Sequence, residues 1–153
     1  MLLQDSLAGC GPAALANAAE ALGLSLDQQK IAKLAKTDGT HGTQPNQLIS
    51  AARKFGLSCH EFQIGTAHFA WVTLKGLLSS GFPVILTVNV NAPEDHYVVA
   101  VGMLGEAVII VDSAASGLLV LRNYKRMMEW WLGGTKKEPS FYGIVVARKV
   151  LKP

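Results

Sequence analysis

The sequence predicts an α+β domain in which helices come first in the chain and pack on one face of an antiparallel β-sheet. Half of the 153 residues are hydrophobic, which is enough for a single core, and the length fits one domain. Ala-rich and amphipathic segments dominate the first half, whereas short β-branched segments between turn residues dominate the second. We therefore expect one domain over residues 1–153, with a helical part over about 1–80 and a sheet part over about 81–150.

Five segments carry helix signals. The first begins at Cys10 with Gly11-Pro12, because proline is tolerated in the first helical turn, and its alanines suit a buried central helix that ends at Gly23. The second begins at Ser25 with a glutamine three residues later, which is the spacing of a capping box. The expected helices cover residues 10–22, 25–35, 45–55, 68–81 and 123–134.

Short apolar segments bounded by Gly, Pro, Asn and Ser predict the strands. Those after Pro83 follow one another closely and are typical of consecutive antiparallel strands. The expected strands cover residues 57–64, 84–90, 96–104, 107–113, 117–122 and 140–150.

The charge pattern argues against nucleic acid as a partner, and the apolar stretches argue against a membrane-spanning segment. The net charge of +3 is spread over different segments without a basic stripe between aromatic residues, so we do not expect nucleic-acid binding. The longest apolar stretch, Tyr97–Val111, is interrupted by two glycines and a glutamate and is too short to span a bilayer. The N-terminus has no pattern of a secretion signal.

The cysteines indicate a reducing compartment. Two residues, Cys10 and Cys59, cannot build a disulfide framework, so we expect free thiols in a cytoplasmic domain. The Cys and His residues show no spacing typical of a metal site, and we expect neither a metal nor a cofactor.

Cys10 stands where a thiol becomes reactive. The unpaired N–H groups and the dipole at a helix N-terminus favour the thiolate, which is the nucleophilic form. A cysteine at a helix start is by itself more often structural, so the interpretation depends on whether a base accompanies it.

His96 is the histidine best placed to be that base. It begins an expected strand, whereas His41, His60 and His68 lie in positions typical of surface or capping residues. The next strand ends in Asp112, and a hairpin between the two strands brings that carboxylate beside His96. An adjacent carboxylate fixes the tautomer of the ring and stabilises its charged form.

Gln4 completes the candidate site. It lies six residues before Cys10, across a short turn with Gly9, and its amide can point back at the sulfur. Together with the backbone N–H of Cys10 it would supply two donors for the oxyanion of an acyl intermediate.

At these residues the chain resembles papain-like cysteine peptidases, and most closely the bacteriocin-processing peptidases that cut leader peptides after a double glycine. The resemblance covers nearly the whole chain and depends on the order of several motifs. They are Q-x5-C-G-P, H-G-T-Q-P-N-Q-L-I-S-A-A-R-K-F-G-L, G-x-P-V-I, D-H-Y-V-V and V-I-I-V-D-S.

The resemblance implies a papain-like fold with a central Cys-bearing helix, and a site made of Cys10 as nucleophile, His96 as base and acid, Asp112 as its orienting group and Gln4 as oxyanion donor. It also implies a peptide or protein substrate and a membrane exporter as a fused or associated partner. The chain departs from the family pattern at Gly9, where many members have an acidic residue, and at Ser113, where many have proline.

Two alternatives remain open at the level of sequence. A peptide-binding module of the same fold would have no turnover, although such modules usually lack the cysteine or the histidine. An acyl or amide transferase would use the same residues, because the acceptor alone separates transfer from hydrolysis. The residues that bind the substrate are not identified by the sequence.

Overall fold

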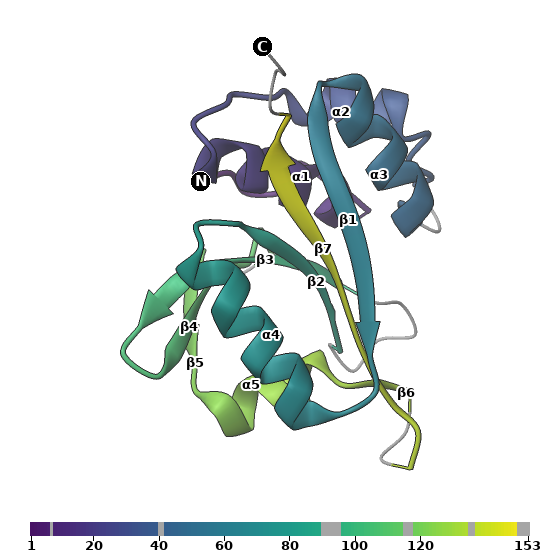
Figure 1. Ribbon diagram of the computed structural model, residues 1–153. Helices are drawn as coiled ribbons and strands as arrows, with labels where there is room; N and C mark the ends of the chain where they lie inside the picture. The colour runs from purple at the N-terminus through teal and green to yellow at the C-terminus, as the bar shows by residue number, and fades with distance from the viewer. Residues whose placement is uncertain (7, 40–41, 90–95, 115–117, 135–136, 150–153) are drawn as a thin grey trace.

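The computed structural model describes residues 1–6, 8–39, 42–89, 96–114, 118–134 and 137–149, which form five helices and a seven-stranded sheet. His41, the turn 91–95 and the outer ends of the expected strands at 117 and 150 lie outside the described residues. The elements, drawn in Figure 1, are α1 (Cys10–Ala21), α2 (Gln28–Leu34), α3 (Pro45–Lys54), β1 (Leu57–Ile64), α4 (Ala67–Ser79), β2 (Val84–Val88), β3 (His96–Leu104), β4 (Ala107–Val111), β5 (Leu119–Arg122), α5 (Tyr124–Trp131), β6 (Gly133–Gly134) and β7 (Pro139–Arg148).

The sheet is antiparallel, as predicted, but it recruits a strand from the first half of the chain. The strand order is β1-β7-β2-β3-β4-β5, with the short β6 paired to β7. Four consecutive strands, β2 to β5, form a meander, and β7 returns between β2 and β1. The predicted division into a helical part before residue 80 and a sheet part after it was therefore wrong for β1, which pairs with β7 from Leu57 to Ile64.

Helices cover both faces of the sheet, so the prediction of helices on one face only was wrong. Side chains of α1, α2 and α3 pack in one core with Ile85, Tyr97 and Val99. Side chains of α4 and α5 pack in a second core with Val84 and Leu86. Neighbouring residues along a strand point to opposite faces, so the apolar run of β2 reflects burial on both sides. Figure 1 shows α1–α3 above and α4 and α5 below the middle of the twisted sheet.

The helix ends follow local side-chain chemistry. Gly23 and Gly56 follow α1 and α3 with φ of 81° and 80°, a backbone conformation that favours glycine, so these predicted ends are confirmed. The predicted capping box at Ser25 was wrong, because the Asp27 side chain caps α2 instead by accepting from the Gln29 N–H at 2.8 Å.

No helix among the described residues is long and apolar enough to cross a membrane.

Candidate active site

Cys10 is the first residue of α1, and the local sequence explains its position. Gly9 precedes the helix, and its carbonyl accepts from the Ala13 N–H at 3.0 Å, so the first helical turn closes directly behind the thiol. Thr43 packs against Gly11 so closely that a Cβ atom on Gly11 would lie 3.0 Å from the Thr43 Cβ. The Tyr97 hydroxyl donates to the Thr43 carbonyl at 2.9 Å. These contacts fix the start of α1 against the start of β3.

The hairpin of β3 and β4 brings His96 and Asp112 together, as the sequence predicted. Val99 pairs with Val111, and Asp112 follows at the end of β4. His96 Nε2 lies 2.7 Å from Asp112 Oδ1, and the two side chains are only 11% and 14% exposed. The same Asp112 oxygen accepts from the Ala114 N–H at 3.1 Å, which holds the carboxylate toward the ring.

The electrostatics of Asp112 favour its charged form. Burial raises the pKa of this carboxyl, but hydrogen bonds from His96 and the Ala114 N–H, together with the nearby charges of His96 and Arg122, outweigh burial and lower the pKa. An ionised carboxylate only accepts hydrogen bonds, so the Nε2 atom of His96 carries the proton that bridges the pair. The other ring nitrogen, Nδ1, remains for Cys10.

Cys10 and His96 shift one another toward a thiolate and an imidazolium. Burial raises the pKa of the Cys10 thiol, but hydrogen bonds from His96 and from the backbone of Tyr97, with the His96 charge, lower it overall. Burial lowers the pKa of His96, but hydrogen bonds and charge from Asp112 and Cys10 raise it to about 9. Between these two pKa values the charged pair is the favoured state.

Gln4 is hydrogen-bonded to Ser113, the residue that directly follows Asp112. Its backbone N–H donates to the Ser113 carbonyl at 3.1 Å, and its side-chain oxygen accepts from the Ser113 hydroxyl at 3.0 Å. Its side-chain Nε2 donates to the Ser6 carbonyl at 2.8 Å. The four predicted residues therefore come from three parts of the fold: the segment before α1, the start of α1, and the β3–β4 hairpin.

Cys59 and the other described histidines lie apart from this cluster. Cys59 is a buried residue of β1, and its burial raises the pKa of the thiol to about 11 despite the Arg53 charge. His60 is exposed, with its ring 3.4 Å from the Ser58 hydroxyl, and His68 is exposed near the start of α4. No cluster of three or more His, Cys, Asp or Glu side chains that could hold a metal ion occurs in the described part of the chain.

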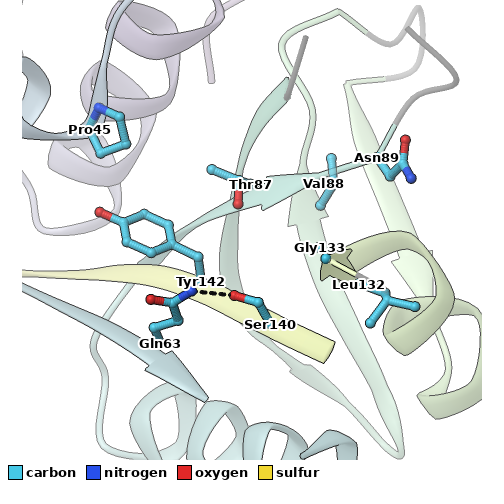
Figure 2. Close-up of a pocket in the computed structure, with 10 residues that line it drawn as sticks. Pro45, Gln63, Thr87, Val88, Asn89, Leu132, Gly133, Ser140 and Tyr142 are labelled. Atoms are coloured by element: carbon cyan, nitrogen blue, oxygen red, sulfur yellow. Dashed lines mark hydrogen bonds between the residues drawn. The ribbon is translucent and has the colours of Figure 1, made fainter. Parts of the chain in front are cut away.

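A hollow of about 360 Å³, which the sequence analysis did not predict, lies near the start of β3. Val88 lines the hollow and pairs directly with His96 across β2 and β3. Figure 2 shows Tyr142 beside the hydrogen-bonded Gln63–Ser140 pair, with Pro45 and Leu132 at opposite sides. Its residues come from the start of α3, from three strands and from the segment after α5, so no local motif marks it. The lining residues are Pro45, Gln63, Thr87, Val88, Asn89, Leu132, Gly133, Gly134, Ser140 and Tyr142.

Comparisons with known proteins identify the family and the fold. A model of the peptidase C39 family matches residues 1–133. The peptidase domain of Streptococcus ComA, a bi-functional ABC transporter of a quorum-sensing pathway, is 24% identical over 96% of each chain, with a TM-score of 0.75. A double glycine motif protease from an AMS/PCAT transporter, solved with its leader peptide, is 19% identical over 95% of this chain and 89% of that one, with a TM-score of 0.68.

A third solved structure is a putative C39-like peptidase from Bacillus anthracis, which is 16% identical over 97% of this chain and 94% of that one, with a TM-score of 0.70. These likenesses show the fold. No curated protein matched the chain.

Proposed function

Because the chain belongs to the peptidase C39 family and is a cysteine peptidase, we propose that it cleaves peptide bonds through Cys10, His96, Asp112 and Gln4. The observation that carries this proposal is the 2.7 Å hydrogen bond between the His96 ring and the Asp112 carboxylate, together with the effect of the same ring in lowering the pKa of the Cys10 thiol. Each link has a direct chemical purpose: a thiolate that attacks, an imidazolium that delivers a proton and a carboxylate that stabilises the imidazolium.

The proposed reaction proceeds through an acyl-enzyme. The Cys10 thiolate adds to the carbonyl carbon of the scissile bond, and the oxyanion that forms accepts from the Cys10 N–H and the Gln4 amide. The His96 imidazolium protonates the leaving amine as the C–N bond breaks, which leaves a thioester on Cys10 and a neutral ring. His96 then takes a proton from water, the hydroxide displaces the thiolate, and the carboxylate product leaves.

We propose a leader peptide with a double glycine before the scissile bond as the substrate. Support comes from the resemblance of the sequence and from a fold neighbour described as a double glycine motif protease. The residues that precede the scissile bond would lie in the hollow, because Val88 lines the hollow and pairs with His96 across β2 and β3. A membrane exporter on the cytoplasmic side is the proposed partner, since two fold neighbours are domains of transporters.

Substrate specificity tests this proposal. A 25-residue peptide with Gly-Gly before the cleavage point is incubated with the protein, alongside the same peptide with Val-Val at that point, and products are followed by mass spectrometry. We expect the valine peptide to be cut at least about tenfold more slowly, because added methyl groups must be accommodated at the reacting centre. Equal rates would contradict double-glycine specificity without affecting the assignment of a peptidase.

The same experiment separates hydrolysis from acyl transfer. Adding a primary amine to the reaction offers a second acceptor for the thioester. Hydrolysis predicts only the free carboxylate product, whereas a transferase would give an amide adduct with a different mass.

A further inference from the structure

Ser113 connects two parts of the proposed site, and the reaction described above gives it no role. It directly follows Asp112 and is 3% exposed, which is unusual for a serine. Its hydroxyl donates to Gln4 Oε1 at 3.0 Å, and its carbonyl accepts from the Gln4 N–H at 3.1 Å. Ser113 therefore holds Gln4 at two points, through its side chain and through its backbone.

The opposite end of the Gln4 amide is also fixed. Nε2 donates to the Ser6 carbonyl, which in addition accepts from the Gly9 N–H at 3.1 Å. A carbonyl oxygen only accepts hydrogen bonds, so turning the amide over would set two oxygen atoms against each other. Ser6 thus selects the direction of the amide, and Ser113 holds its oxygen. The donor end is bound to Ser6, whose carbonyl also accepts from Gly9, the residue directly before Cys10.

We propose that Ser113 is a positioning residue that fixes the Gln4 amide so that its NH₂ group is presented to the oxyanion beside Cys10. The inference rests on the proposed function, in which Gln4 is an oxyanion donor. Donors stabilise a transition state most when they need no reorganisation as charge develops. An amide that has lost its Ser113 partner must first be oriented, and its contribution to turnover falls accordingly.

The surrounding contacts allow the Ser113 side chain to be tested by itself. The segment before Gln4 is anchored separately, because Asn17 accepts from the Leu2 N–H at 2.6 Å and donates to the Leu2 carbonyl at 2.9 Å. The backbone bond between Gln4 and Ser113 does not involve a side chain. Ser113→Ala therefore removes one hydroxyl contact and leaves the other anchors in place.

The test is a double-mutant cycle with Gln4→Ala. Turnover is measured on a peptide that ends in Gly-Gly joined to aminomethylcoumarin. Ser113→Ala is expected to lower kcat about fivefold, the effect of one neutral hydrogen bond, with KM unchanged. Gln4→Ala is expected to lower kcat by about 100- to 1000-fold, the usual cost of one oxyanion donor. In the Gln4→Ala background, Ser113→Ala is expected to have no further effect, because the group it positions is gone.

Two results would overturn the proposal. One is an equal loss of kcat from Ser113→Ala in both backgrounds, which would show that the hydroxyl acts independently of Gln4. The other is an unchanged kcat for either single variant. Alkylation of Cys10 depends on His96 and is expected to be the same in all four proteins. If the kcat values contradict the cycle while Cys10 is still alkylated rapidly, only the role of Ser113 is wrong and the peptidase mechanism is unaffected. If Cys10 of the wild-type protein is not reactive, the proposed function itself is wrong.

Discussion

Cys10→Ala is expected to abolish peptide cleavage, with a loss in kcat of about four orders of magnitude or more, because the proposed reaction has no other nucleophile. Alanine is a strong helix former, so the start of α1 is expected to remain folded. Cleavage is measured on the Gly-Gly peptide, and binding of the same peptide is measured by fluorescence anisotropy. We expect binding to be retained while turnover is lost.

Cys59→Ala is the matched control for this experiment. It removes the only other thiol, which is buried in β1 away from the cluster, and it is expected to leave turnover unchanged. Cleavage that persists in Cys10→Ala would remove this residue from the mechanism. A protein that binds the peptide but never cuts it, with or without Cys10, would behave as the peptide-binding module considered from the sequence.

His96→Ala is expected to reduce turnover about as strongly as Cys10→Ala, because residues that act as a unit give losses that do not add. Two separate functions are lost together. Without the ring the Cys10 thiol retains the burial that raises its pKa and loses the largest contribution that lowers it, so little thiolate forms at neutral pH. The leaving amine also loses its proton donor.

The exposed His60 provides the control, and His60→Ala is expected to keep full activity. The double variant Cys10→Ala with His96→Ala is expected to be no slower than either single one. A His96→Ala protein that retains more than about a tenth of wild-type kcat would contradict the assignment of this residue as the base.

The parts of the fold that local chemistry determines could be predicted from sequence. The strands 57–64 and 96–104 were placed correctly because alternating or β-branched runs are bounded by turn residues. The start of α1 at Cys10 was correct because Gly11-Pro12 suits a first turn. The β3–β4 hairpin brought His96 and Asp112 together as predicted, although the sequence analysis did not predict the register shift between Ala100 and Gly102.

The parts that depend on long-range pairing could not be predicted. The position of β7 between β1 and β2 follows from pairing over a large distance in sequence, as between Leu57 and Arg148. The two-sided burial of β2 follows from that placement. The orientation of Gln4 depends on Ser113, and the hollow near His96 depends on five separate segments. In each case the determining contacts join residues that are distant in sequence.

The resemblance to bacteriocin-processing peptidases is confirmed by the family match over residues 1–133. The roles of Cys10, His96, Asp112 and Gln4 remain proposals. Their common basis is the charged pair between the thiol and the ring, because the pKa of the Cys10 thiol is lowered while the pKa of His96 is raised to about 9.

Alkylation of the two thiols by iodoacetamide from pH 4 to 9, located by mass spectrometry, tests this pair most directly. The account predicts that Cys10 reacts rapidly, with a midpoint below the ordinary pKa of a thiol, while Cys59 is slow throughout because its pKa is raised to about 11. His96→Ala is expected to shift the Cys10 midpoint upward. A Cys10 that reacts no faster than Cys59, or whose pH dependence is unaffected by His96→Ala, would contradict the account.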